Sequence, residues 1–245
     1  MKISLTGSGA LAEAYLKVNP SAEVFSFRKM EDDQIVKVIR SSDVIVHNSA
    51  SLSDENDNFE LTKRIVDLVG TFKPRIKFIN IGSMSYLSGD GYLPIERMTR
   101  YAYSKFISEI YSLALLPNAR SVRFSTIFYK SPQRDGLSKL IHASKMEKKI
   151  TLINGGSARR DFIPLGIAAR YLDYVIREET AQIINICSGI ETSFYQVAKM
   201  ILKYIDARLV FEKGEVPEVR SWFIRELPEI VFSLEEEIKY YICEP

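Results

Sequence analysis

A glycine turn between an apolar run and a helical segment is the feature that most constrains what this chain can fold into. The run ends at Thr6, and Gly7-x-Gly9-x-x-Ala12 then opens a segment of helical composition. A nucleotide pyrophosphate needs close backbone approach and the unpaired N–H groups of a helix start. Gly7 would make the tight turn, Gly9 would leave bare backbone for the pyrophosphate, and Ala12 would let the helix pack against the strand. The pattern alone is weak, because small residues gather in many loops, so an ordinary turn is the alternative.

Short apolar runs alternate with longer amphipathic segments along the chain. The sequence predicts strands at 2–6, 22–28, 43–48, 75–82, 120–127 and 182–187. Helical patterns lie between them, at about 10–18, 31–41, 55–70, 100–115 and 164–178. This alternation predicts an α/β fold, a Rossmann-type doubly wound parallel sheet with helices on both faces. Ligands of such sheets bind beyond the carboxyl ends of the strands.

The rhythm of the sequence changes after residue 128. A turn-rich link begins at Lys130, a strand and turn follow Ile150, and a strand near 208–212 precedes a final helix near 233–242. We therefore expect a dinucleotide-binding core at 1–129, completed by 164–188. The remaining segments, 130–163 and 189–245, are expected to form a smaller substrate-binding lobe.

Composition excludes several classes of protein. The net charge of +2 gives no reason to expect a nucleic-acid or membrane partner. Two cysteines and two histidines, without ligand spacing, predict no disulfide framework and no metal site. The amino terminus enters a strand directly, and no apolar run reaches the roughly 18 residues of a membrane span. We expect a cytoplasmic protein.

Three residues that carry chemistry follow the glycine turn in a definite order. Ser83 ends a strand, and Tyr101 and Lys105 are four residues apart on the next helix, hence on one face. Reduction of a carbonyl needs a hydride donor, an acid and a donor that holds the oxygen, which a nicotinamide, Tyr101 and Ser83 could supply. Tyrosine is a poor acid or base at its usual pKa of about 10. A nearby ammonium favours the phenolate, which gives Lys105 a role.

The Tyr-x-x-x-Lys spacing alone carries little information, because it often occurs by chance. A second instance, Tyr195-x-x-x-Lys199, follows the last predicted strand of the sheet. No glycine turn or strand-end serine accompanies it, so we interpret it as a surface or packing pair. Order and context make the first pair informative.

Several motifs together resemble the extended short-chain dehydrogenase/reductase superfamily, the NAD-dependent epimerase/dehydratase family. They are Thr6-Gly7…Ala12, Asp43-Val-Ile-Val-His-Asn-Ser-Ala50, Asn58-x-x-x-Thr62, Asn80-Ile-Gly-Ser83, Tyr101-x-x-Ser-Lys105, Ser121-Val-Arg-Phe-Ser-Thr-Ile-Phe-Tyr, Arg160-Asp-Phe-Ile-Pro-Leu, Ile184-Asn-Ile-Cys-Ser-Gly and Phe232-Ser-Leu-Glu-Glu-Glu-Ile. They occur in the family's order over nearly the whole chain. The short segment after the second strand is similar to that of the dTDP-4-dehydrorhamnose-reductase-like nucleotide-sugar reductases.

The resemblance implies site residues. It places the cofactor against Gly7, Ser8, Gly9, Ala10, Leu11, Arg28, Asn48, Ser49, Ala50, Tyr101, Lys105, Phe124 and Ser125. It places a nucleotide-sugar substrate against Ser83, Met84, Ser85, Thr126, Arg160 and Arg220, with Arg225 as a further candidate for its diphosphate. The chain departs from the family pattern in a glycine loop one residue shorter, in Phe124 for proline, in Thr126 for asparagine and in Gly166 for aspartate.

Charge indicates the choice of cofactor. A carboxylate at the end of the second strand would hold the ribose hydroxyls and repel a 2′-phosphate. This chain instead has Arg28-Lys29 there. We therefore expect NADP(H), with Arg28 on the 2′-phosphate, and NAD(H) as a possible substitute; the alternative for Arg28 is a solvated strand-end charge.

The residues after Ser83 narrow the reaction. Sugar-nucleotide dehydratases of the family carry Asp-Glu there, and this chain has Met84-Ser85. Cys187 and His142 do not match the added acid/base pair of the epimerase-reductases, and His47 is expected to pack near the cofactor. The resemblance thus favours NADPH-dependent reduction of a nucleotide-linked 4-keto-6-deoxyhexose. A C-4 epimerase with tightly bound NAD and a non-catalytic dinucleotide sensor remain alternatives.

The resemblance also implies a partner. Members of the superfamily often dimerise through the helices that correspond to 55–70 and 100–115. Ile107, Ile110 and Leu113 could serve such a homodimer contact or pack on the sheet.

Overall fold

Two compact units make up the fold. The computed structural model describes residues 1–50, 56–88, 91–130, 135–178, 181–214 and 232–243. The first unit comprises Met1–Tyr86, Tyr92–Phe124 and Gly166–Ile186, and the second comprises Leu87–Gly91, Ser125–Leu165 and Cys187–Pro245. The boundary between the first unit and the long segment of the second unit that follows it lies after Phe124, whereas the sequence predicts this boundary at residue 129.

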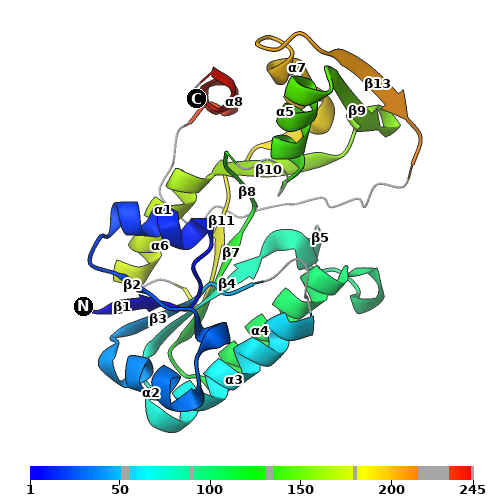
Figure 1. Cartoon of the computed structure of the whole chain (residues 1–245). Helices are drawn as coiled ribbons and strands as arrows, with labels where there is room; N and C mark the ends of the chain where they lie inside the picture. The colour runs from blue at the N-terminus through cyan, green and yellow to red at the C-terminus, as the bar shows by residue number, and fades with distance from the viewer. Residues whose placement is uncertain (51–55, 89–90, 131–134, 179–180, 215–231, 244–245) are drawn as a thin grey trace. The chain divides into compact units, whose positions relative to one another are not determined.

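A parallel sheet forms the centre of the first unit (Figure 1). Over the described residues it has six strands in the order β11-β7-β4-β3-β1-β2. Their bounds are β1 Ile3–Leu5, β2 Glu23–Val24, β3 Val44–His47, β4 Lys77–Ser83, β7 Ala119–Phe124 and β11 Ile183–Ile186. The helices of this unit are α1 Ala10–Val18, α2 Asp32–Ser41, α3 Asn56–Phe72, α4 Arg100–Leu115 and α6 Leu165–Arg177. The predicted doubly wound α/β fold is confirmed.

Helices cover both faces of this sheet (Figure 1). The α1 and α6 helices share one face, where the Tyr15 hydroxyl donates to Asp173 Oδ1 at 2.8 Å. The α2, α3 and α4 helices cover the other face. They connect β2 to β3, β3 to β4 and β4 to β7, which all run the same way across the sheet, so right-handed crossovers place these three helices on one face. The carboxyl ends of β1, β3 and β4 consequently reach one edge of the sheet.

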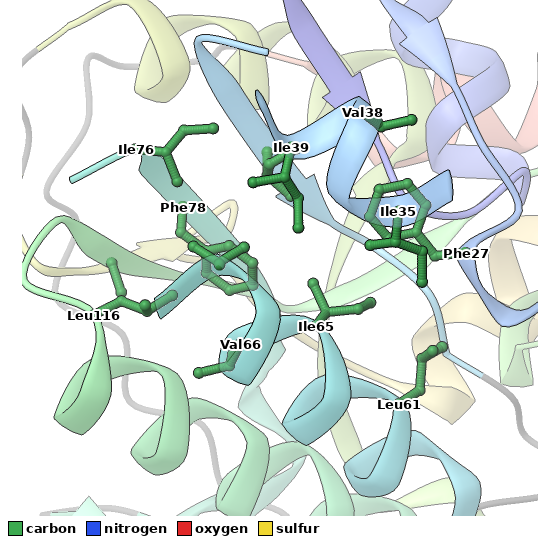
Figure 2. Close-up of a cluster of buried hydrophobic side chains, with 13 residues drawn as sticks. Phe27, Ile35, Val38, Ile39, Leu61, Ile65, Val66, Ile76, Phe78 and Leu116 are labelled. Atoms are coloured by element: carbon green, nitrogen blue, oxygen red, sulfur yellow. The ribbon is translucent and has the colours of Figure 1, made fainter. Parts of the chain in front are cut away.

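A cluster of buried apolar side chains joins the sheet to α2 and α3 (Figure 2). Phe27, Ile35, Ile39, Ile65 and Phe78 are all fully buried in it. The cluster also contains Val38, Ile45, Leu61, Val66, Val69, Ile76, Leu116 and Ala119. In the helices these residues recur at three- and four-residue spacing, so each helix presents one apolar stripe to the sheet.

Two predicted strands were too long. The expected strand 22–28 ends at Val24, and Phe27–Lys29 form a short 3-10 turn (η1) that directs the Phe27 ring into the apolar cluster. The expected strand 120–127 divides at Ser125. The segment before it pairs with β4 and β11, and the segment after it, β8 (Thr126–Phe128), pairs with β10 (Arg159–Pro164) of the second unit.

The second unit is built from short strands and three helices among its described residues. Its strands are β8 and β10 with β12 (Glu191–Ser193) in one sheet, and β9 (Lys149–Ile153) with β13 (Arg208–Glu212) in another. Its helices are α5 (Gly136–Met146), α7 (Phe194–Ile201) and α8 (Leu234–Cys243). Their apolar faces share a buried cluster that includes Leu137, Ile150, Phe162, Val197 and Ile238.

Shorter elements complete the described chain. Strands β5 (Leu87–Ser88) and β6 (Gly91–Tyr92) form a two-stranded sheet. The 3-10 turns are η2 (Met84–Tyr86), η3 (Ile95–Arg97) and η4 (Asn154–Gly156). Within the described ranges, no helix combines the length and the apolar character that crossing a bilayer requires.

The apolar cluster gives a direct test of this packing. Ile65→Ala should lower the free energy of unfolding by about 2–5 kcal/mol, because it leaves a cavity beneath α3. The matched control is Ile95→Ala in the same unit, whose side chain is 59% exposed, and it should change stability by less than about 0.5 kcal/mol. Urea unfolding followed by circular dichroism measures both, and equal losses would contradict the assignment of Ile65 to the core.

Candidate active site

The loop after β3 holds the glycine turn in place. Gly7 N–H donates to Asn48 Oδ1 at 2.9 Å, and Asn48 Nδ2 donates back to the Gly7 carbonyl at 2.8 Å. Ser49 Oγ donates to the Thr6 carbonyl at 2.5 Å. A Cβ on Gly7 would lie 2.8 Å from Ser49 Oγ and 3.1 Å from its Cα, so only glycine fits there. Asn48 and Ser49, expected on the cofactor, thus also shape the turn that would bind it.

Gly9 has a different reason to be glycine. It caps α1 with φ −78°, a backbone conformation open to any residue, and a Cβ added there would meet nothing within 4 Å. No packing within the described chain requires a glycine at this position. An open helix start without a side-chain cap suits a pyrophosphate, which needs that space and those N–H groups. The exposed Ser8 and the half-buried Ala10 and Leu11 border it, and Ala12 is buried beneath.

His47 links the carboxyl ends of the strands to α3. Its Nδ1 lies 2.9 Å from Thr6 Oγ1, and its Nε2 lies 2.9 Å from Thr62 Oγ1. Burial lowers the pKa of His47 to about 3, and the charges of Lys105 and Arg28 act in the same direction. The imidazole is therefore neutral at physiological pH and serves as a structural hydrogen-bonding group between two hydroxyls.

Ser83 and Tyr101 come together at the end of β4, and Lys105 lies one turn after Tyr101 on α4. Ser83 is the last residue of β4, and Tyr101 lies in the first turn of α4, which Thr99 caps by accepting from Ala102 N–H at 3.1 Å. Ser83 lies close enough to Tyr101 for its side chain to favour the phenolate form of the tyrosine. Lys105 follows one turn later and is 4% exposed. The order of the motifs predicts that Ser83 and Tyr101 lie near one another, and the catalytic roles of the three residues stay a prediction.

Burial controls the charge of both titratable residues. Burial raises the pKa of Tyr101 and the Ser83 side chain opposes that effect, so the hydroxyl carries its proton at neutral pH. Burial lowers the pKa of Lys105 to about 8, against the favourable charge of Glu109. The pair is therefore a phenol that carries its proton and, one helical turn away, a lysine whose ammonium form is disfavoured by burial and favoured by Glu109.

Arg28 is engaged with a carboxylate that sequence reasoning missed. It lies in the η1 turn after β2, and its guanidinium forms an ion pair with Asp57 in the first turn of α3. Both side chains are about one-third exposed, at 36% and 38%. A 2′-phosphate at this position would meet Arg28 together with its acidic partner.

Sequence reasoning also missed a buried polar cluster near Ser83, Tyr101 and Lys105, the three residues called the triad below. Glu109 is fully buried on α4 and bonds to Arg123 of β7 and Tyr86 of η2. The available signal was its spacing, because Glu109 follows Lys105 by four residues on the sheet-facing side of the helix.

The remaining predicted site residues are distributed over both units. In the first unit, Met84 and Phe124 are buried, Ser85 Oγ accepts from Ser83 Oγ at 2.9 Å, and Ala50 is exposed after β3. Ser125, Thr126 and Arg160 belong to the second unit.

Arg160 lies on β10 and donates to the Arg159 carbonyl at 2.8 Å. Arg220 and Arg225 lie outside the described residues. The second Tyr-x-x-x-Lys pair is confirmed as a surface pair, since the exposed Lys199 ammonium lies 5.5 Å from the centre of the exposed Tyr195 ring.

Comparison with known families now identifies the chain. Residues 14–187 match the NAD dependent epimerase/dehydratase family, a range that covers well over half of the 245 residues. The chain belongs to this family. It is therefore an enzyme of the NAD(P)-dependent short-chain dehydrogenase/reductase type, and the resemblance drawn from its motifs is confirmed. Among curated proteins, none matches the sequence significantly.

Solved structures of low sequence identity share the fold. The dTDP-4-dehydrorhamnose reductase of Bacillus anthracis, in complex with NADP, has a TM-score of 0.80 at 16% identity, with 99% of this chain and 98% of that chain covered. The dTDP-glucose 4,6-dehydratase of the same organism, in complex with NAD, has a TM-score of 0.80 at 16% identity, with 99% of this chain and 95% of that chain covered. The UDP-glucose 4-epimerase of Thermotoga maritima, with UDP-glucose, has a TM-score of 0.79 at 14% identity, with 99% of this chain and 97% of that chain covered.

The buried His47 predicts how stability depends on pH. Its folded-state pKa of about 3 lies below the usual histidine value of 6.5, so below pH 6.5 the unfolded chain binds a proton that the folded protein does not. The free energy of unfolding should fall as pH drops from about 6.5 toward 3, with His47 contributing up to about 3 kcal/mol of the loss at pH 4. His47→Asn should be less stable at pH 7 and have a shallower pH dependence. Denaturant titrations between pH 4 and 7 measure both slopes, and parallel slopes would contradict a neutral buried imidazole.

Proposed function

We propose that this enzyme uses NADPH to reduce a keto group on a nucleotide-linked sugar, of the 4-keto-6-deoxyhexose type. The observation that carries the proposal is the approach of Tyr101, in the first turn of α4, to Ser83 at the end of β4, with the buried Lys105 one turn later on the helix. In this proposal, Tyr101 is the acid, Ser83 holds the carbonyl oxygen and Lys105 is the cation that tunes the acid. The glycine turn beside them suits a dinucleotide pyrophosphate.

Each residue of the triad has a distinct role in this proposal. The nicotinamide supplies a hydride to the carbonyl carbon when the cofactor is bound. The Tyr101 hydroxyl gives its proton to the carbonyl oxygen, so ketone, hydride and proton become an alcohol and the cofactor leaves oxidised. Lys105 stabilises the Tyr101 phenolate until solvent returns the proton, and Ser83 holds the carbonyl oxygen through a hydrogen bond.

The residues after Ser83 favour reduction over dehydration. The family's dehydratases use an acidic pair there to remove water. Here Met84 is buried, and Ser85 accepts a hydrogen bond from the Ser83 hydroxyl. Neither residue supplies a carboxylate for elimination, which leaves the triad and the cofactor as the chemical groups.

The assignment to nucleotide sugars is supported by what related folds bind. Solved structures that share the fold carry UDP-glucuronic acid with NAD, or UDP-glucose with NAD, at 15% identity. In this chain, Arg160 of the second unit and Arg220 are the proposed contacts of the substrate diphosphate, with Thr126 near the sugar. The first unit would bind the dinucleotide and the second the substrate.

A homodimer through α3 and α4 is part of the proposal. Ile110 is 45% exposed on α4, and the partly buried Ile107 lies one turn before it. Leu113 packs against the apolar cluster of the first unit instead. The proposed contact therefore uses Ile107 and Ile110.

The reaction itself gives the main test. Turnover of a panel of dTDP-, GDP-, UDP- and CDP-linked 4-keto sugars can be followed by NADPH absorbance. One of them should be reduced, and Tyr101→Phe should lower kcat at least about 100-fold, because it removes the acid. Tyr195→Phe is the matched control from the surface Tyr-x-x-x-Lys pair and should retain activity. Failure to reduce any sugar, together with NAD retained through purification, would favour a C-4 epimerase. Unchanged turnover in Tyr101→Phe would refute the assigned role of Tyr101.

The cofactor preference has its own pair of variants. Arg28→Ala should weaken NADPH binding at least about 10-fold more than NADH binding, because only NADPH carries the 2′-phosphate. Asp57→Asn removes the carboxylate that pairs with Arg28 and should strengthen NADPH binding relative to NADH. Fluorescence titration of both cofactors measures these ratios. Equal weakening of both cofactors in Arg28→Ala would overturn the preference for NADP(H).

A further inference from the structure

A buried carboxylate on α4 has no role in the chemistry described so far. Glu109 is 0% exposed and lies one helical turn after Lys105. Its Oε2 accepts from Arg123 Nε at 2.9 Å and from the Tyr86 hydroxyl at 2.7 Å. It also accepts from the Ser121 hydroxyl, and Arg123 Nη2 bonds to Oε1, which makes the ion pair bidentate.

This carboxylate is ionised. Burial alone would raise the pKa of Glu109, but the bonds and charge of Arg123, with the bonds from Ser121 and Tyr86, lower it below its usual value. Burial and Glu109 together raise the pKa of Tyr86 well above its usual value, so that hydroxyl remains a donor. Glu109 and Arg123 therefore form a buried ion pair, and Glu109 is its anionic member on α4.

The charge of Glu109 reaches Lys105. It favours the ammonium form of Lys105 against the cost of burial. The neighbouring elements add few other charges. The titratable and charged groups of the described residues that face this region are Tyr101 and Glu109 from α4, His47 from β3, Arg28 from η1, Tyr86 from η2, Tyr92 from β6 and Arg123 from β7. Only Glu109 in this group brings a negative charge at neutral pH.

The same carboxylate reaches Ser83 through Tyr86. The Ser83 N–H lies 3.4 Å from the Tyr86 hydroxyl oxygen, and that hydroxyl donates to Glu109. A Cβ on Gly82 would lie 2.8 Å from the Tyr86 hydroxyl oxygen, so the strand leaves room for this bond only with glycine there. Arg123 also lies 5.5 Å from the centre of the Tyr86 ring and fixes its position.

We propose that Glu109 is a positioning residue of the active site. It keeps Lys105 in its ammonium form, and it holds the strand-end serine through Tyr86. This inference rests on the proposed function for the roles of Lys105 and Ser83, but the effect of Glu109 on Lys105 can be measured without turnover.

The first experiment compares the pH dependence of kcat/KM in three proteins. In Glu109→Gln the basic limb should move to lower pH by about one unit, because the charge that favours the ammonium is gone. Asp173→Asn is the matched control, since Asp173 also accepts from a tyrosine hydroxyl and an arginine, on the opposite face of the sheet. Its limb should stay at the wild-type pH. An unmoved limb in Glu109→Gln, or an equal shift in both variants, overturns the proposal.

A second variant covers the case in which Glu109→Gln fails to fold with Arg123 left unpaired. Glu109→Gln/Arg123→Met removes both buried charges, a change that proteins often tolerate. It should fold and show the same shift of the basic limb. A double variant that folds with the wild-type limb overturns the proposal.

A third measurement needs no substrate. Because the folded-state pKa of Lys105 is lowered to about 8 from its usual 10.5, the unfolded chain binds more protons between these values, and stability rises with pH there. The pH profile of unfolding free energy of wild type, minus that of Lys105→Met, isolates this rise. In the Glu109→Gln background, the same difference should begin to rise at lower pH. This shift without any sugar reduction would reject the proposed function and keep the inference; reduction without the shift would reject the inference alone.

Tyr86→Phe separates the two parts of the role. It removes the hydroxyl that accepts from Ser83 N–H but leaves the Glu109 charge in place. The variant should lower kcat several-fold, with little change in KM and with the basic limb at the wild-type pH. A wild-type kcat in Tyr86→Phe overturns the link between Glu109 and Ser83.

Discussion

The contact between α4 and strands β4 and β7 is the constraint on which the candidate active site depends. It brings Ser83 from the end of one strand against Tyr101 on the helix, and it buries Lys105 one turn later. Glu109 and Arg123 form an ion pair across the same contact. Replacing such a pair by apolar residues would often be neutral or stabilising, so stability alone does not explain its presence. In our proposal, Glu109 of this pair instead favours the ammonium form of Lys105.

The polar groups at the carboxyl ends of the strands form a continuous set of mutual contacts. Thr6 bonds to His47, His47 bonds to Thr62, and Asn48 bonds twice to Gly7. Each bond joins residues far apart in sequence, so the glycine turn is held by the neighbouring strand and by α3. A neutral His47 is suited to this place, because a second cation beside Lys105 would further disfavour its ammonium form.

Much of the fold could be predicted from the sequence, and the sequence also predicts the set Ser83, Tyr101 and Lys105. The six strands of the sheet follow apolar runs, and α1 to α4 follow amphipathic patterns whose bounds agree within two residues. The exceptions have physical causes. The strand expected to 28 ends at Val24 because Phe27 turns into the core, and the strand expected over 120–127 divides at Ser125 because its two parts pair with different sheets. Neither cause is local to the segment.

The sequence by itself determined the class of protein, because strand–helix alternation, the glycine turn and the Tyr101–Lys105 spacing are local patterns in a fixed order. The match to the NAD dependent epimerase/dehydratase family agrees with them. Only the tertiary structure decided which charges meet. The ion pair of Arg28 with Asp57, and the burial of Glu109 beside Lys105, depend on helices packing against a sheet. Sequence spacing fixes which residues share a face, but desolvation and partner charge arise only when that face is covered.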